Sequence, residues 1–139
     1  MKIGEWDNLG RARALVQRQL GELNAAELAA HVTVNPDNGR VRIYVATDIG
    51  LLDYVYGPAG ADPEGAWLLR GSLIRWGSLR ALRLQSDAQL GDLEGDPPRE
   101  SWRLVADEPK IELGAASDGE ERAIEALLAF ARACLAHAG

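Results

Sequence analysis

The chain has 139 residues, of which 47% are hydrophobic and 26% charged, and its net charge is -6. This length fits one domain around a single apolar core, and the composition is not that of a disordered chain or a coiled coil. The excess of acid argues against a protein that grips nucleic acid over a broad basic surface. No apolar run approaches the roughly 20 residues that cross a bilayer, so we expect no membrane span.

Cysteine content and the start of the chain bear on location. Cys134 is the only cysteine, which excludes an internal disulfide, and the opening MKIGEWDN lacks the apolar run of a signal peptide. We therefore expect a cytoplasmic protein. Arginine greatly outnumbers lysine, a bias that we attribute to a GC-rich bacterial genome.

The first thirty residues predict helical structure, because apolar side chains recur every three or four positions, at Leu9, Ala12, Val16, Leu20 and Leu23. Asp7 is placed to cap the start, and Gly21 weakens or ends this first helix. The segment from Asn24 to Glu27 has the form of a capping box. It predicts either a short second helix reaching Ala29 or Ala30 or one bent helix over the whole segment.

From His31 onward the apolar period changes to two, which is typical of strands. HVTV and RVRIYVAT flank the turn residues Pro36 to Gly39, so we expect an antiparallel hairpin. Val41, Ile43 and Val45 then share one face. The sequence from Asp48 to Gly50 predicts a second tight connection, into a third strand over residues 51–56.

The next segments predict four more strands. Residues 57–65 form a loop rich in glycine and proline, and the fourth strand runs from Ala66 through Trp76 with a break near Gly71. A fifth strand covers residues 79–85 with a bulge at its entrance. A long polar loop then leads to a sixth strand over 101–106 and a seventh over 110–115.

A helix closes the chain. Ser117 to Glu120 has the form of a capping box, and a broad apolar face follows, formed by Ile124, Leu127, Leu128, Ala131, Cys134 and Leu135. The fold class is therefore α+β: a seven-stranded antiparallel sandwich or barrel capped by a C-terminal helix, with an extra N-terminal helix.

This order of elements resembles the pleckstrin-homology (PH)-like fold. ATDIGLLDYVYG, residues 46–57, and IRWGSLRALRL, residues 74–84, are similar to hairpin segments of bacterial PH-like and GRAM-like domains. The resemblance covers residues 31–137. It implies two sheets packed nearly at right angles with the helix at one open end, a domain over residues 31–139 and a helical extension over 1–30. Fold alone transfers no function.

One stretch stands out in an acidic chain. GAWLLRGSLIRWGSLRALRLQS, residues 65–86, holds four arginines and two tryptophans but no carboxylate. On an unbroken strand Arg70 and Arg75 point to opposite faces, and a bulge at Gly71 would bring them together. The favoured interpretation is instead a solvated strand face on which the aliphatic stem of each arginine covers aromatic surface. The candidate contacts for a partner or an anion are Arg70, Arg75, Trp76, Arg80 and Arg83.

Arg40 and Arg42 are weaker candidates for an anion. In phosphoinositide-binding PH domains basic residues gather around the first hairpin, and these two fit the second-strand part of that pattern. No lysine or arginine precedes them in the first strand, however, and Asp37 lies in the turn. A phosphate site needs two or three converging cations without a competing carboxylate, so we do not expect lipid headgroup binding.

The sequence predicts no metal, cofactor or catalytic site. The acids of residues 92–96 lack the glycine and the twelfth-position acid of a calcium loop, and His31, His137 and Cys134 show no metal-ligand spacing. We expect Trp67, Trp102 and Cys134 to pack in the core or at sheet ends. No nucleophile elbow or phosphate-cradling loop is present, although carboxylates such as Asp48 and Asp53 could meet in space.

The leading hypothesis is thus a non-catalytic interaction module that acts through protein contacts, either with a partner or by self-association through sheet edges or the N-terminal helix. A second hypothesis is a small-ligand or anion-binding domain in which Arg70, Arg75 and Arg80 converge with Trp76. A third is an enzyme of unrecognised type, which requires a pocket where carboxylates or His31 approach one another.

Overall fold

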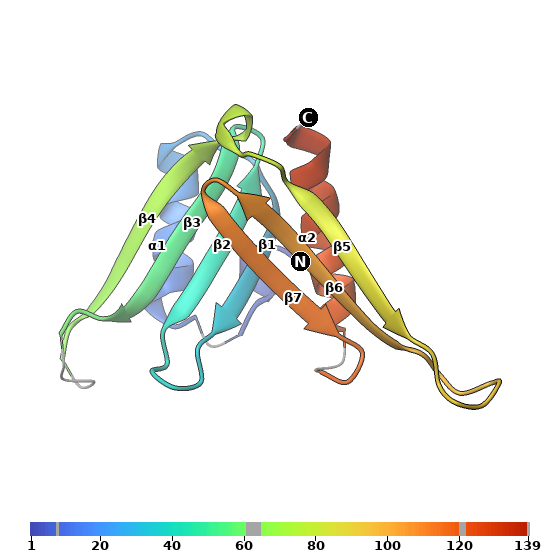
Figure 1. The fold of residues 1–139 in the computed structure, drawn as a ribbon. Coiled ribbons are helices and arrows are strands. Elements are labelled where there is room, and N and C mark those ends of the chain that lie inside the picture. The colour runs from blue at the N-terminus through green and yellow to red at the C-terminus, as the bar shows by residue number, and fades with distance from the viewer. Residues whose placement is uncertain (8, 61–64, 120–121, 139) are drawn as a thin grey trace. The chain divides into compact units, whose positions relative to one another are not determined.

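The structure is a computed structural model that describes residues 1–7, 9–60, 65–119 and 122–138. The chain divides into two compact units, Met1–Trp76 and Gly77–Gly139, which we describe separately. The elements in chain order are η1 (Ile3–Glu5), α1 (Arg11–Glu22), β1 (Glu27–Val34), β2 (Val41–Thr47), β3 (Gly50–Pro58), β4 (Trp67–Arg75), η2 (Trp76–Ser78), β5 (Arg83–Gln89), β6 (Arg99–Asp107), β7 (Lys110–Ala116) and α2 (Ala123–His137) (Figure 1).

The first unit is built on a four-stranded antiparallel sheet in the order β1-β2-β3-β4. The predicted hairpin of β1 and β2 is confirmed, with His31 opposite Tyr44 and Val34 opposite Val41. Its turn is held by asparagine side chains, because Asn35 Oδ1 accepts a hydrogen bond from the amide of Asp37 and Asn38 Oδ1 accepts one from Arg40. Such side-chain turns are local, which is why the sequence predicted them well.

The connection from β2 to β3 is also as tight as expected. The hydroxyl of Thr47 is fully buried, donates to the carbonyl of Gly50 at 2.7 Å and accepts from the amides of Ile49 and Gly50. One side chain therefore satisfies the backbone groups of this turn that would otherwise be left unpaired.

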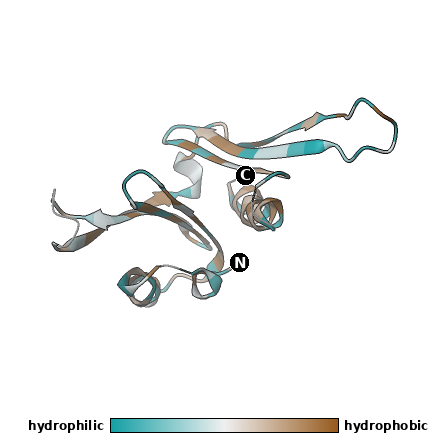
Figure 2. Ribbon diagram, turned by 90° about the horizontal axis from the view of Figure 1, so that it is seen from below, coloured by the Kyte–Doolittle hydropathy of each residue, from teal (hydrophilic) through white to brown (hydrophobic). Residues whose placement is uncertain are grey.

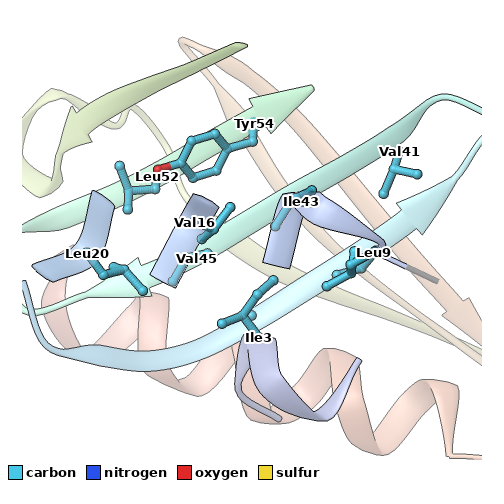
Figure 3. Close-up of a cluster of buried hydrophobic side chains, with 12 residues drawn as sticks. Ile3, Leu9, Val16, Leu20, Val41, Ile43, Val45, Leu52 and Tyr54 are labelled. Atoms are coloured by element: carbon cyan, nitrogen blue, oxygen red, sulfur yellow. The ribbon is translucent and has the colours of Figure 1, made fainter. Parts of the chain in front are cut away.

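Helix α1 covers one face of this sheet, which we call the helix face. Ala12, Val16 and Leu20 recur at helical spacing and are buried against Val41, Ile43, Val45 and Leu52. Figure 3 labels Val16 and Leu20 of the helix and Val41, Ile43, Val45 and Leu52 of the sheet, together with Ile3, Leu9 and Tyr54. Figure 2 shows both hydrophobic and hydrophilic colours along α1, as expected for a helix that buries one stripe.

The start of the first helix differs from the prediction. Leu9 is buried, but α1 begins only at Arg11, and its N-cap residue is Gly10 rather than Asp7. Residues 3–5 instead form the short helix η1, and Ile3 packs into the core. The chain bends at Gly10, whose φ of 53° suits glycine, so the apolar spacing seen in the sequence crosses a break in the helix.

The predicted helical segment over residues 24–30 is wrong, because these residues lead into strand β1. Asn24 has a φ of 54° and ends the helical region, and Ala29 and Ala30 pair with Ala46 and Val45. The carboxylate of Glu27 accepts a hydrogen bond from the amide of Ile3 instead of closing a capping box. Alanine favours helices locally, but pairing with β2 overrides that preference.

Strand β4 runs without the expected break. Its nine residues pair with β3 in an uninterrupted register from Gly50 opposite Arg75 to Pro58 opposite Trp67, and no bulge interrupts it at Gly71. Gly71 lies directly opposite Tyr54, and a Cβ at this position would overlap the Tyr54 ring. The glycine therefore makes room for an aromatic side chain and does not bend the strand.

The second unit holds a three-stranded antiparallel sheet in the order β5-β6-β7. β6 and β7 follow the prediction, but β5 covers residues 83–89, whereas residues 79–85 were expected. Leu79 and Leu82 precede the strand, because residues 76–78 form η2 and Ala81 has a φ of 55°. The irregular spacing in the sequence thus marks a turn before the strand.

Helix α2 follows β7 in this second unit. It begins at Ala123 after Arg122, whose φ is 70°, and its buried residues are Ala126, Leu127, Phe130, Ala131 and Cys134. The predicted cap at Ser117 is wrong, because its hydroxyl accepts a hydrogen bond from the amide of Glu100 in β6. Glu120, the other half of the predicted capping box, lies outside the described residues.

Within the residues that the structure describes, the fold is thus α+β, with a four-stranded antiparallel sheet in the first unit and a three-stranded antiparallel sheet followed by a C-terminal helix in the second. The predicted division into a helical extension over 1–30 and a domain over 31–139 stays a prediction. In the structure α1 shares its core with the first sheet.

The contact between Gly71 and Tyr54 leads to a stability test. Gly71→Ala places a methyl group where the ring lies, so we expect the free energy of unfolding to fall by about 1 to 3 kcal/mol in urea titrations. Gly21→Ala is the matched control, because nothing lies within 4 Å of a Cβ there, and alanine in helix α1 should be neutral or stabilise by up to about 1 kcal/mol. Equal stability of the two variants would contradict the packing role of Gly71.

Candidate functional site

The arginines of β4 point to opposite sides of the first sheet. Residues directly across an antiparallel pair share a face, so Arg75, opposite Gly50, lies on the helix face together with Leu69, Gly71 and Leu73. Arg70, opposite Val55, lies on the other face. Because β4 has no bulge, the structure does not bring Arg70 and Arg75 together.

A different group of arginines gathers on the face away from α1, and we call Arg40, Arg42 and Arg70 the arginine cluster. Arg42 and Arg70 pair with Val55 from its two sides, which separates their Cα atoms by two strand spacings, about 10 Å. Arg40 precedes β2, and its stem runs over Gly57, the next β3 residue on this face after Val55. The weaker candidates thus share a face with Arg70.

Asp53 is the one carboxylate that contacts this cluster among the described residues. Both of its oxygens accept hydrogen bonds from Arg42, at 3.0 and 2.7 Å. This hydrogen bonding raises the pKa of Arg42. The guanidinium of Arg42 also lies 5.3 Å from the ring centre of Tyr44, whose own pKa is raised by burial. Arg42 is therefore held in place by Asp53. Among the described residues, Arg40 and Arg70 form no side-chain hydrogen bond or ion pair with another side chain.

An open depression lies beside the cluster at the end of the β1–β2 hairpin. Its volume is about 480 Å³, and its lining consists of Thr33, Val34, Asn35, Pro36, Arg40, Val41, Arg42 and Val55. The polar part of this lining consists of two guanidinium groups, a hydroxyl and an amide. Such groups donate hydrogen bonds and would suit an anionic ligand.

The other candidate contacts from the sequence are Trp76, Arg80 and Arg83. Trp76 was placed among the surface candidates, but it is 8% exposed and its indole N–H donates to the carbonyl of Thr47 at 2.9 Å. Arg80 and Arg83 belong to the second unit. Arg83 is held by the carbonyl of Ala81 and the carboxylate of Asp107, and Arg80 pairs through its backbone with Glu108.

The outer edge of β4 is a feature that the sequence pattern did not single out. β4 ends the strand order of its sheet, so one side of its backbone has no paired strand (Figure 1). Three of its apolar side chains are well exposed, with Trp67 at 41%, Leu68 at 45% and Leu73 at 39%. A long edge strand that carries apolar side chains is a template for pairing with another strand.

The opposite edge of the same sheet is covered in part, at Ala30 of β1. The amide of Ala30 in β1 donates to the carbonyl of Met1 at 2.6 Å, and the indole N–H of Trp6 donates to the carbonyl of Ala30 at 3.1 Å. The N-terminal segment thus occupies hydrogen-bonding groups of β1 that another strand would need. Of the two edges of this sheet, only that of β4 is left without such a cover in the described residues.

An apolar groove adjoins the start of β4 on the helix face. It has a volume of about 450 Å³ and is lined by Gly10, Val34, Gly39, Val41, Tyr56 and Trp67. The rings of Tyr56 and Trp67 lie 5.1 Å apart and form one wall. Trp67 therefore does pack at a sheet end, as expected, but it stays partly open to solvent.

The candidate carboxylates Asp48 and Asp53 have different partners. Asp48 accepts a hydrogen bond from the amide of Ala26, whereas Asp53 binds Arg42. Burial raises the pKa of Cys134 to about 12, so its thiol stays protonated. Across the described residues, no three His, Cys, Asp or Glu side chains lie close enough together to hold a metal ion.

Comparisons with known proteins identify no relative of this chain. No protein-family model matches the chain, and no curated protein or solved structure is significantly similar to it. Within the residues that the structure describes, neither helix is long and apolar enough to cross a membrane.

His31 predicts a pH dependence of stability. Burial, and after it the positive charge of the N-terminus, lowers the pKa of His31 from 6.5 to about 4. Below pH 6.5 the unfolded chain takes up a proton that the folded chain does not, so stability falls progressively until about pH 4. We expect the free energy of unfolding to be about 2 kcal/mol lower at pH 5 than at pH 7 because of this residue.

Urea titrations of the wild type and of His31→Gln at the two pH values test this expectation. Carboxylates titrate mostly below pH 5, so the variant should lose most of the difference. A variant as sensitive to pH as the wild type would exclude His31 as the cause.

Proposed function

We propose that this protein is a non-catalytic interaction module of the PH-like type, and that it acts through protein contacts made at the edge of β4. The observation that carries the proposal is the edge itself, which is nine residues long, lies at the end of the strand order and exposes Trp67, Leu68 and Leu73. An extended segment of protein added there would gain main-chain hydrogen bonds along the strand.

Specificity would come from side chains on both faces of β4. On the helix face, the exposed ring of Trp67 offers a surface on which an aromatic or aliphatic side chain of the added strand would pack. On the other face, Leu68 and Ile74 flank Arg70 and Ser72. An added strand should therefore alternate, with apolar residues at matching positions on each face.

A library of extended peptides of about ten residues, displayed on phage and selected on the immobilised protein, tests the proposal. We expect peptides with alternating apolar residues to be enriched, and Leu68→Lys to weaken their binding about tenfold, because the change removes apolar contact and adds a charge at the edge.

Leu93→Lys is the matched control for this selection. Leu93 is also an exposed leucine, at 72%, but it lies in the loop between β5 and β6 and should leave peptide binding unchanged. Failure to select any peptide, or equal loss of binding in the two variants, would refute the role of the β4 edge.

The arginine cluster supports a second function, anion binding. Arg40, Arg42 and Arg70 share one face beside a depression whose lining includes hydrogen-bond donors as well as apolar side chains. This site shares Arg70 with the convergence of Arg70, Arg75 and Arg80 that the sequence suggested, whereas Arg75 lies on the other face of the sheet. Asp53 competes for Arg42, so the affinity for a single anion should be modest.

Titration of inorganic phosphate, followed by amide chemical shifts, tests anion binding. Arg70→Gln should lower the affinity about tenfold, because a charge-assisted hydrogen bond is lost. Arg75→Gln removes the same charge from the same strand on the other face and should have little effect. If both variants bind phosphate as the wild type does, Arg70 is not part of an anion site.

A further inference from the structure

We propose that the strand that occupies the edge of β4 is β4 of a second copy of this chain, paired antiparallel about a two-fold axis at Gly71. This inference rests on the proposed function and names its partner. Two four-stranded sheets would then join into one continuous sheet of eight strands.

The sequence of β4 is self-complementary about Gly71. In an antiparallel pair centred there, Leu69 lies opposite Leu73 of the second copy and Leu68 lies opposite Ile74. Two-fold symmetry makes each of these contacts twice. Apolar side chains therefore meet apolar side chains on both faces, which is the favourable arrangement for cross-strand neighbours.

The charges of β4 fit the same arrangement. Arg70 lies opposite Ser72 of the second copy, and Arg75 lies opposite Trp67, where a guanidinium can stack on the indole. No two arginines are directly opposite in this register. The strand contains no carboxylate, so nothing else would offset a pair of arginines that faced each other.

Other registers that keep the faces aligned are poorer. An axis at Arg70 places Arg70 opposite itself, and an axis at Ser72 places Leu69 opposite Arg75. Each shift also leaves two residues of β4 without a partner at one end of the strand, whereas the pairing about Gly71 uses the whole strand. The combination of length, apolar matching and charge separation thus selects Gly71 as the centre.

The contact between Gly71 and Tyr54 within one copy makes Gly71 suitable as the centre of the pairing. The Tyr54 ring lies where a side chain at residue 71 would be, so apolar surface covers the glycine on the helix face. A cross-strand aromatic of this kind compensates for the missing side chain of an edge glycine. At the centre of the paired strands the two glycines would therefore contribute no side chains, but the Tyr54 ring of each copy would cover their backbone on the helix face.

Charge changes at Ser72 test the pairing by analytical ultracentrifugation of the full chain. In the dimer residue 72 faces Arg70 of the other copy, and by symmetry the contact occurs twice. We expect a reversible dimer, weakened about threefold to tenfold by Ser72→Lys and strengthened by a similar factor by Ser72→Glu. Adding Arg70→Glu to Ser72→Lys should restore it, because opposite charges then face each other.

Within one copy the same substitutions should change the stability of the monomer in the direction opposite to their effect on dimer affinity. The two causes can therefore be told apart. Ser72 lies directly across from Asp53 in β3, so lysine should stabilise the monomer and glutamate should destabilise it. A change in dimerisation that merely followed monomer stability would therefore have the reverse signs and would overturn the proposal. A wild-type chain that stays monomeric at protein concentrations up to about 500 μM would also overturn the proposal, because we expect the dissociation constant of the dimer to lie below that concentration.

Disulfide trapping tests the register. Arg70→Cys and Ser72→Cys, mixed under mild oxidation, should form a cross-linked dimer, whereas each variant alone should not, because identical positions are not opposite each other. The native Cys134 is buried and should not react. Cross-linking in the single variants, or none in the mixture, would exclude the register about Gly71. If peptides bind the edge but the chain does not dimerise, this inference fails and the proposed function stands; if neither occurs, both fail.

Discussion

The contact between Tyr54 and Gly71 is the constraint on which the first unit depends. The ring occupies the space of the missing side chain, and its hydroxyl donates to Gln19 of α1 at 2.7 Å. One residue of β3 thereby ties β4 on one side to the helix above the sheet. With β4 held straight, the register from Gly50 to Pro58 is uninterrupted, and the side of the sheet on which each β4 residue lies is fixed.

That fixed register decides how charge is distributed. Arg70 falls on the face of Arg40 and Arg42, and Arg75 falls on the helix face. In a chain with a net charge of -6, three arginines on one face make a local positive region, and Asp53 offsets part of it. The proposed anion site therefore takes only Arg70 from the arginine-rich stretch, and strand pairing adds Arg40 and Arg42 to it.

The two edges of the first sheet differ in whether another segment of the chain hydrogen-bonds to them. The N-terminal segment returns along β1, where Met1 and Trp6 take up the backbone N–H and C=O of Ala30 and the amide of Ile3 donates to the carboxylate of Glu27. β4 has no such cover in the described residues, and it carries apolar side chains on both faces. An uncovered edge of this kind exposes a chain to unwanted pairing, which is the reason for our proposal that a partner strand pairs with β4.

The sequence by itself determined the local parts of this protein: the strand periods from His31 onward, the two tight turns around Gly39 and Asp48, and the apolar stripe of α1. These features depend on neighbours in the chain, so composition and spacing suffice to predict them. Residues 24–30 were predicted wrongly because helix propensity is local, whereas the pairing of Ala29 and Ala30 with β2 is not. Only the tertiary structure decided that Gly71 accommodates a ring rather than a bend, that Trp76 is buried and that β4 is left at the edge, because each of these is set by residues distant in the sequence.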